Sequence, residues 1–294
     1  MLSPLEIAQR LSGNGLNFLI GGFSIGLRST LPQVTRGIGS MYGDFPIVPD
    51  NQFIDFRIDI ASPSLLRRYF RPQVNFNFDG KHPFKPLPLN QSFAMFEWGL
   101  NWVIANHAHH FAIVHAAAVE KNGRGFIFPG APGSGKSTLC AALVCRGWRL
   151  LSDEMAMVSL KDGLIWPIPR PISLKNASID IIRKFGTSVV LGDIVADTAK
   201  GNVAHMRPPK ASVDAVHTAV NPYAIVFPTY RAGVNTVFEE EPKAKTLIRL
   251  AENCFNYPVL GGAGFNALGD SVDQSLCRTL VYSDLADAIG AIER

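Results

Sequence analysis

A chain of 294 residues, of which 47% are hydrophobic and 18% charged, can bury one large core or two unequal ones, which excludes a largely disordered protein. The net charge of +4 comes from Lys and Arg scattered along the chain, without the basic stripe of a nucleic-acid binder. Four cysteines without a CxxC pair, no signal-peptide pattern and no long uninterrupted apolar stretch predict a cytoplasmic protein without a membrane partner.

The first 90 residues are predicted to be rich in strands. Apolar and polar residues alternate over 53–60 and again over 74–78. The Pro-rich stretch 82–88 lacks a full set of backbone donors, so it is expected to mark the crossing into a second unit. We therefore expect a β-rich N-terminal region at residues 1–90 and a separate domain at residues 91–294.

Strands and helices alternate in the second unit. An apolar helical pattern covers 92–106, and two buried strands at 111–119 and 125–128 precede a helix at 136–146. This order predicts an α/β fold, a mixed sheet with flanking helices. Further elements are expected downstream: short strands near 150, at 155–160 and 164–168, a helix starting near 176 or 178, a strand at 224–227 and a last helix at 285–293.

One segment matches the Walker A pattern G-x-x-x-x-G-K-[ST] of P-loops without a gap, directly after a predicted strand and directly before a predicted helix. Glycines let several backbone N–H groups turn toward one anion, and the helix adds the positive end of its dipole. A Gly-rich turn with an accidental lysine is the alternative, but the flanking elements favour phosphate binding. The predicted nucleotide-binding residues are Gly130, Ala131, Pro132, Gly133, Ser134, Gly135, Lys136, Ser137 and Thr138.

Phosphoryl transfer needs more than a phosphate-binding loop. Lys136 is expected to reach the β- and γ-phosphates of ATP, and the Ser137 hydroxyl to ligate Mg²⁺. An acidic element must help hold the metal and handle the acceptor proton, and Asp153-Glu154 supplies it at the end of the next strand. We assign the metal to Asp153 and the acceptor hydroxyl to Glu154, with the reverse assignment left open. A solvated acidic turn is the alternative interpretation.

The stretch from His115 to Met157 resembles the catalytic core of the HPr kinase/phosphorylase family, specifically the branch of HPr-related kinases. In that family a histidine begins a strand, a P-loop ending in GKS follows, and an Arg-Gly-Trp helix end precedes a pair of acids. The matching order here is His115, the loop at 130–137, the helix end at 146–148 and the acid pair at 153–154.

The resemblance implies a PEP-carboxykinase-like P-loop fold and phosphoryl transfer from ATP to a hydroxyl, by the family's chemistry a seryl one, on a protein, peptide or small molecule. It also implies that His115 lies near the phosphates, as a catalytic residue beside Lys136, Asp153 and Glu154. A core-filling role is the alternative for His115. The family's second aspartate is Glu154 here, and its glycine-rich signature stretch is missing, so neither HPr as acceptor nor the reverse phosphorylase reaction is assigned.

Three further cations are candidate ligands of the substrate or of a phosphate. Arg170 lies within the extended Pro-rich stretch 166–171 and Lys175 follows it, whereas Arg207 lies between Met206 and two prolines. Kinases often place a planar cation on the transferring phosphoryl group. A rigid connector and simple surface exposure are the alternatives.

The leading hypothesis is thus a Mg²⁺-dependent kinase that uses ATP, with the preference over GTP left open. A nucleotide-gated binding module without turnover and a carboxykinase-like enzyme acting on an oxoacid are the alternatives. The N-terminal region is expected to recognise the acceptor or to mediate assembly into a homo-oligomer.

Overall fold

The N-terminal part of the computed structural model, which describes residues 2–294, is built on a five-stranded sheet. Its strands pair in chain order, and all pairs are antiparallel except β2 with β3. Strands β3 and β4 bury alternate residues, so one face of the sheet packs on helices. The strands are β1 (Leu16–Ile20), β2 (Phe23–Ser29), β3 (Phe56–Ala61), β4 (Gln73–Phe78) and β5 (Leu87–Pro88).

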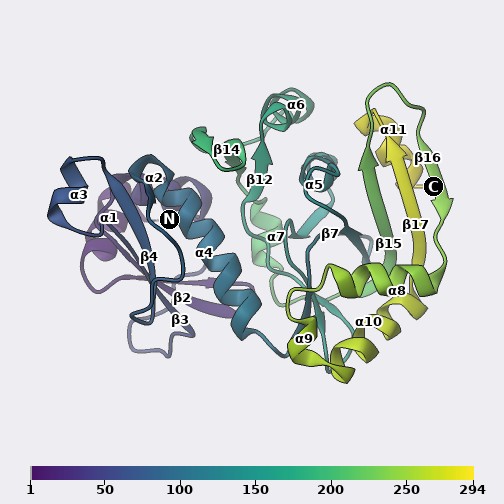
Figure 1. Ribbon diagram of the computed structural model, residues 1–294, viewed down its shortest axis with the longest axis horizontal. Helices are drawn as coiled ribbons and strands as arrows, with labels where there is room; N and C mark the ends of the chain where they lie inside the picture. The colour runs from purple at the N-terminus through teal and green to yellow at the C-terminus, as the bar shows by residue number, and fades with distance from the viewer. Residues whose placement is uncertain (1) are drawn as a thin grey trace.

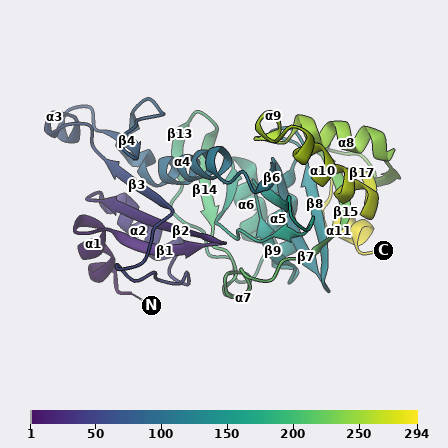
Figure 2. The ribbon, with the colours of Figure 1, turned by 90° about the horizontal axis from the view of Figure 1, so that it is seen from below.

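Three helices complete this first core, and a fourth stands apart from it. Figures 1 and 2 show α1 (Pro4–Ser12), α2 (Pro32–Met41) and α4 (Ser92–His107) against the sheet, and their apolar residues belong to one buried cluster with it. The short helix α3 (Leu65–Tyr69) buries none of its residues. A 3-10 turn, η1 (Leu89–Gln91), leads into α4.

Helix α4 confirms the predicted helix at 92–106 and packs tightly on the N-terminal sheet. The ring of Phe76 lies over Gly99, where a Cβ atom would come within 2.0 Å of it, so only glycine fits. Phe96 and Leu100 are fully buried in the same cluster. This core draws residues from both sides of the predicted boundary near residue 90, and the division into two domains stays a prediction.

The second part is organised around a six-stranded mixed sheet with the order β16-β17-β15-β8-β7-β9. Strands β8, β9, β15 and β17 run in one direction, while β7 and β16 run against them. The strands are β7 (Ala116–Lys121), β8 (Arg124–Pro129), β9 (Arg149–Ser152), β15 (Asn221–Tyr230), β16 (Val237–Glu240) and β17 (Leu276–Tyr282).

Helices cover both faces of this sheet. Helices α5 (Lys136–Cys145), α6 (Ala177–Phe185) and α11 (Leu285–Ile292) share one buried cluster with it, and α8 (Lys243–Glu252) and α10 (Gly262–Gln274) share another. The predicted mixed α/β fold with flanking helices and a β-rich N-terminal part is confirmed. The remaining helices are α7 (Lys210–Asp214) and α9 (Tyr257–Leu260).

Two three-stranded sheets connect the two parts. One has the order β11-β10-β6 and the other β12-β14-β13. Their strands are β6 (Phe111–Val114), β10 (Ala156–Ser159), β11 (Ile165–Trp166), β12 (Ile172–Lys175), β13 (Val195–Thr198) and β14 (Gly201–Met206). Within residues 2–294, no helix combines the length and apolar character needed to cross a bilayer.

The prediction of a single strand at 111–119 is wrong in one respect, because His115 interrupts it and divides it into two strands. Residues before the break form β6 and pair with β10, whereas residues after it form β7 in the six-stranded sheet. Both strands are buried along almost their whole length, so an unbroken apolar run conceals the passage from one sheet to the next.

Candidate active site

Three of the predicted site segments meet at one end of the six-stranded sheet, where strands β8 and β9 end and β7 begins. Strand β7 pairs with β8 through Ala116 and Pro129, and with β9 through Ala118 and Ser152. Because β7 is antiparallel to both neighbours, its first residue lies beside their last residues. His115 before β7, the P-loop after β8 and the acid pair after β9 are therefore brought together.

The P-loop wraps around the first residues of α5. Gly133 and Gly135 have φ values of 85° and 95°, a left-handed conformation that favours glycine. The Lys136 ammonium is buried and donates hydrogen bonds to the carbonyl oxygens of Gly130 and, at 3.0 Å, Ala131. Burial lowers the pKa of Lys136, and the nearby Asp153 carboxylate opposes that shift. The lysine thus lies inside the loop and close to the acids.

Two tyrosines at the ends of β15 and β17 form hydrogen bonds with the P-loop. The Tyr282 hydroxyl donates to the carbonyl oxygen of Gly135 at 3.2 Å, and the backbone N–H of Tyr230 donates to that of Ser134 at 3.0 Å. A Cβ atom on Gly135 would lie 2.4 Å from the Tyr282 hydroxyl oxygen. The shape of the loop therefore depends on the C-terminal strand.

Asp153 is a buried carboxyl group, 5% exposed, at the end of β9. Its Oδ2 accepts a hydrogen bond from the backbone N–H of Ser173 at 2.9 Å, whereas Oδ1 is buried without a hydrogen-bond partner among residues 2–294. Burial raises the pKa of Asp153 to about 7, and the negative charge of Glu154 adds to the shift. The Ser137 hydroxyl is close enough to lower that pKa, but it makes no well-aligned hydrogen bond with Asp153.

These two side chains fit a magnesium ion. Mg²⁺ in nucleotide sites typically takes one or two carboxylates, hydroxyls, water and phosphate oxygens. The free Oδ1 of Asp153 and the Ser137 hydroxyl are oxygen donors of this kind, beside the loop. No group of three or more His, Cys, Asp or Glu side chains that could hold a metal occurs in the described part of the chain, and a nucleotide-bound Mg²⁺ does not require one.

Glu154 has a different environment from its neighbour. Its Oε2 accepts a hydrogen bond from the side-chain amide of Asn101, and its Oε1 lies 4.0 Å from the Lys175 ammonium. Burial alone would raise the pKa of Glu154, but the positive charges of Lys175, Lys200 and Arg170 together lower it. The pKa values of the two adjacent carboxyl groups therefore differ, and only Glu154 is ionised well below neutral pH.

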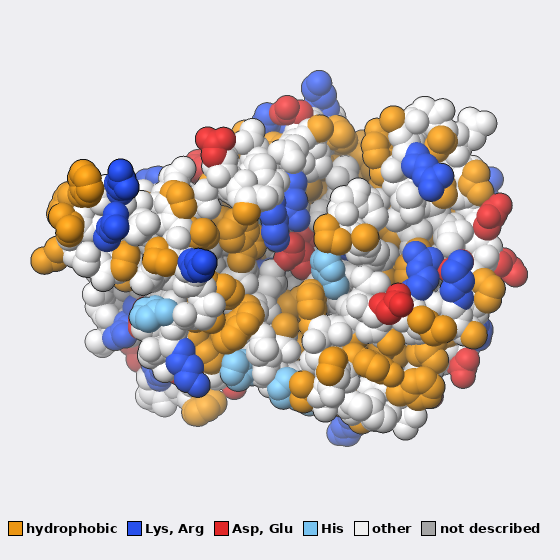
Figure 3. All heavy atoms as spheres, in the orientation of Figure 1, with side chains coloured by type: hydrophobic (Ala, Val, Ile, Leu, Met, Phe, Trp, Pro, Cys, Tyr) orange, Lys and Arg blue, Asp and Glu red, His pale blue; other side chains and the backbone are white. Residues whose placement is uncertain are grey.

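His115 lies at the same end of the sheet, as a neutral imidazole. Its backbone N–H donates to the carbonyl oxygen of Asn253 at 2.7 Å, and its ring packs on Phe255 with the centroids 5.3 Å apart. Burial lowers the pKa of His115 to about 4, and the positive charge of Lys136 adds to this shift. Figure 3 shows a hollow between the two parts of the molecule, where basic side chains lie beside an acidic one and a histidine.

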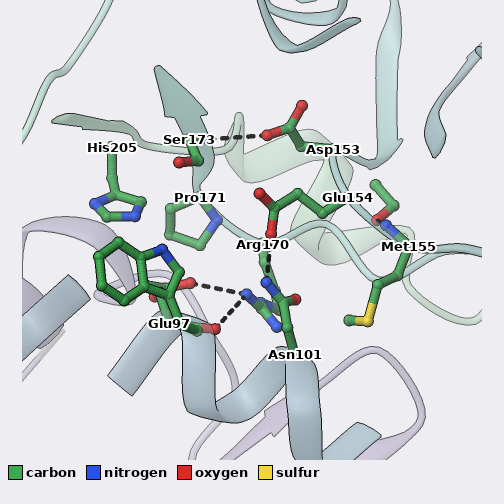
Figure 4. A pocket seen from close by; sticks show the side chains of 11 residues that line it. Glu97, Asn101, Asp153, Glu154, Met155, Arg170, Pro171, Ser173 and His205 are labelled. Carbon is green, nitrogen blue, oxygen red and sulfur yellow. Dashed lines mark hydrogen bonds and ion pairs between the residues drawn. The ribbon is translucent and has the colours of Figure 1, made fainter. Parts of the chain in front are cut away.

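Behind the acid pair lies a cavity of about 20 Å³, which is room for one water molecule. Figure 4 shows that side chains of α4, of the end of β9 and of the residues before β12 converge on it. Many of their buried polar atoms have no partner in the described chain, which indicates that water or a ligand completes the site. These atoms are Trp98 Nε1, Asn101 Oδ1, Asp153 Oδ1, Arg170 Nε and Nη1, Ser173 Oγ and His205 Nε2.

The three candidate substrate cations have different surroundings. Lys175 faces Glu154, as described above. Arg170 lines the cavity and is buried, and its guanidinium donates to Oε2 of Glu97 at 3.0 Å and to the Glu97 carbonyl oxygen at 3.2 Å. Arg207 forms an ion pair with Asp44 of the N-terminal part and is not among the residues that line the cavity.

The sequence prediction missed the contribution of helix α4. Glu97 and Asn101 lie four residues apart, so they share one side of a helix that is otherwise apolar toward the core. That i,i+4 polar pair was the available signal. Lys200 was also missed, because it lies in a turn without a motif, with its ammonium 5.3 Å from the centre of the Trp98 ring.

The sequence is similar to curated proteins called HPr kinase/phosphorylase. Three of them, from three strains of Streptococcus thermophilus, are each 32% identical to the chain over 98 residues. The match covers 31% of this chain, and the chain spans about a third (32%) of the length of these relatives. Over these 98 residues the chain resembles HPr kinase/phosphorylases. The predicted family resemblance is confirmed, whereas the narrower branch of HPr-related kinases stays a prediction.

No protein-family model matches the chain. The HPr(Ser) kinase/phosphatase of Coxiella burnetii aligns with 61% of this chain and 91% of its own, with 13% identity and a TM-score of 0.28. A score of that size carries no weight, and the mixed α/β architecture rests on the sheets described above.

Proposed function

We propose that this HPr kinase-like protein transfers the γ-phosphoryl group of ATP to a hydroxyl of a protein, peptide or small molecule, with a seryl hydroxyl as the expected acceptor. One observation carries the proposal. Strand β7 holds the P-loop and the acid pair on either side of itself at the same end of the sheet, with His115 between them. A phosphate-binding loop and an ionised carboxylate that face one another are the minimum for phosphoryl transfer to a hydroxyl.

The proposed division of labour follows the two carboxyl environments. Residues 130–138 bind the phosphates, with Lys136 against the β- and γ-phosphates. Ser137 and Asp153 hold Mg²⁺, which neutralises phosphate charge when bound. Glu154, whose pKa is lowered, orients the acceptor hydroxyl and accepts its proton. This choice between the two acids is the one that the pKa directions favour.

The surrounding cations and His115 have proposed roles as well. Lys175 and Lys200 neutralise the charge that gathers around Glu154 and the phosphates. His115, neutral above about pH 4, offers a ring N–H near the phosphates. Arg170, paired with Glu97 in the cavity behind the acid pair, helps to keep Glu154 ionised through its positive charge. A contact of Arg207 with the acceptor stays a prediction.

Transfer of label from γ-labelled ATP in the presence of Mg²⁺ tests the proposal. The acceptor panel includes HPr, seryl peptides and small alcohols. We expect product with the wild type and with Lys161→Ala, a substitution in an exposed turn, and none above background with Lys136→Ala or Asp153→Ala. Equal transfer by all four proteins would show that the site is wrongly assigned.

Two other outcomes would identify the alternative functions. Calorimetric binding of ATP without product across the whole panel would favour a nucleotide-gated binding module. Nucleotide consumption that depends on oxaloacetate would favour a carboxykinase-like enzyme. A cytoplasmic location accords with the four free cysteines, and the location and a homo-oligomer both remain part of the proposal.

A further inference from the structure

The helix α3 projects from the far end of the N-terminal part. Figures 1 and 2 place it at one end of the long axis of the molecule, opposite the C-terminus. None of its residues is buried, and its hydrogen bonds are local ones, such as that from the Arg67 N–H to the Ser64 hydroxyl at 3.2 Å. Arg71, which follows it, has a φ of 47°, a strained value for a residue with a side chain. The fold of the protein gains no core from this segment.

Four large apolar side chains of this segment are exposed to water. The exposed fractions are 79% for Leu65, 68% for Leu66, 78% for Tyr69 and 61% for Phe70. An apolar group this concentrated marks an interaction surface, since isolated exposed residues are common but clusters are not. Figure 3 shows hydrophobic side chains with basic ones among them at the tip of this part.

The segment is basic as well as apolar. Arg67, Arg68 and Arg71 lie among the exposed apolar residues, and none of them forms an ion pair within residues 2–294. Residues 60–78 contain no Asp or Glu. Helical spacing sets the leucines and Tyr69 on one side of the turn and the first two arginines on the other. The surface is thus amphipathic, with an uncompensated positive charge.

We infer that this tip, Leu65–Arg71, docks on the surface of a lipid bilayer that contains anionic lipids. A short amphipathic segment with Leu and aromatic residues on one side and Arg on the other suits the boundary between headgroups and acyl chains. A groove on a protein partner normally takes anchors from two or more helical turns, and α3 has little more than one. Docking of this kind requires no transmembrane helix.

The inference revises the expectation that the protein has no membrane partner. That expectation came from the lack of a long apolar stretch, which concerns spanning and not surface contact. The tip is remote from the six-stranded sheet in Figure 1, so docking leaves the proposed active site accessible. The inference does not depend on the proposed kinase activity.

Co-sedimentation of the full chain with vesicles tests the inference. We expect binding to vesicles of phosphatidylcholine with phosphatidylglycerol, weaker binding to phosphatidylcholine alone, and a decrease with added salt. Arg67→Glu/Arg68→Glu should lower the partition constant by at least about 30-fold, because each arginine removed accounts for about fivefold and each added carboxylate is repelled by the anionic lipids. Leu66→Ser/Phe70→Ser should lower it at least about tenfold, because the inserted apolar surface is lost.

Matched substitutions at other exposed positions serve as controls. Ile248→Ser/Phe265→Ser, on α8 and α10, and Lys184→Glu, on α6, should bind vesicles as the wild type does. The thermal unfolding midpoints of the tip variants should stay near that of the wild type, since α3 buries nothing. No binding of the wild type to anionic vesicles, or equal binding by tip and control variants, would overturn the inference. So would a dimer in light scattering that Leu66→Ser/Phe70→Ser converts to a monomer, because the occupant would then be a second copy.

Discussion

Asn101 of helix α4 donates a hydrogen bond from its side-chain amide to Oε2 of Glu154, although 53 residues separate the two in the chain. Helix α4 packs on the N-terminal sheet, whereas Glu154 follows a strand of the six-stranded sheet. The contact therefore links the two parts of the protein at the proposed acceptor carboxylate, and the N-terminal part helps to fix the orientation of that group.

Replacing Asn101 by Leu should slow phosphoryl transfer more than it weakens nucleotide binding. The substitution removes the donor that orients Glu154, so we expect kcat to fall about tenfold with the KM for ATP unchanged. Steady-state transfer from labelled ATP measures both. Asn106→Leu, at the exposed end of the same helix, is the control and should keep full activity. A similar loss in both variants would mean that the helix, rather than the contact, matters.

The effects of substitutions in the buried ion pair of Arg170 and Glu97 on the free energy of unfolding should not be additive. Glu97 also accepts a hydrogen bond from the Tyr42 hydroxyl at 2.6 Å. Arg170→Met leaves the Glu97 carboxylate buried without its cation, and we expect a loss of about 3 to 5 kcal/mol in the free energy of unfolding. The double variant Glu97→Leu/Arg170→Met should recover most of it in urea unfolding.

The same double variant distinguishes two roles of Arg170, which are stabilisation of the fold around the acid pair and direct contact with a phosphate or the acceptor. If Arg170 only stabilises the fold around the acid pair, the double variant should regain a large part of the phosphoryl-transfer activity together with its stability. Recovery of stability with activity still absent would instead support the predicted contact of Arg170 with a phosphate or the acceptor. A double variant as unstable as Arg170→Met would contradict the ion-pair account.

The raised pKa of Asp153 should make the contribution of this group to stability less favourable as the pH rises from about 4 to about 7. In this range the folded state retains a proton that the unfolded chain, with a pKa of 3.8, has lost. This contribution to the free energy of unfolding should fall by up to roughly 4 kcal/mol across the window and then level off. The lowered pKa of His115 contributes in the opposite direction over the same range, so the effect of Asp153 is isolated by comparing the wild type with Asp153→Asn. Urea unfolding at a series of pH values in metal-free buffer measures this.

Asp153→Asn should remove the contribution of Asp153 and leave that of His115. The asparagine carries no charge, so the variant should be more stable than the wild type above pH 7 and equal to it near pH 4. It should also lose phosphoryl transfer, since the metal ligand is gone. Asp270→Asn, on the exposed surface of α10, should retain the wild-type slope. Parallel stability profiles for the wild type and Asp153→Asn would assign the titration to another group.

A comparison of two P-loop glycines tests whether contact with Tyr282 stabilises the loop. Both Gly133 and Gly135 have positive φ, but only at Gly135 would a Cβ atom meet a neighbour, the Tyr282 hydroxyl. Gly133→Ala should cost about 1 kcal/mol from the backbone conformation alone. Gly135→Ala should cost clearly more and weaken ATP binding in calorimetry. Equal unfolding free energies for the two variants would show that the tyrosine contact has no effect.

Local patterns predicted the P-loop, the acid pair and the order of the elements around them, because these depend on short spacings. The alternation at 53–60 and the helix at 92–106 correspond to β3 and α4. The pattern could not reveal the break at His115, because both sides of it are buried. The Gly-rich stretch at 261–264, whose composition favours a turn, instead leads into α10, where the helix buries Leu268 and Val272. Packing there outweighs the low helix propensity of glycine.

Contacts between distant segments were beyond what spacing could predict. The pairing of Arg170 with Glu97 and of Arg207 with Asp44 joins residues 73 and 163 positions apart. Such partners are set by how the two parts pack, and no local sequence rule specifies them. The same holds for the polar lining of the small cavity, to which α4 contributes Trp98 and Asn101.

The support of Gly135 by Tyr282 also has a consequence for biosynthesis. Tyr282 is added to the growing chain 147 residues after Gly135, so the complete Walker A segment leaves the ribosome long before the strand that shapes it exists. We therefore expect no assistance from ATP through this loop in the early stages of folding. Capture of the nucleotide is instead a late event, and it reports that the last strand has been made and has joined the sheet.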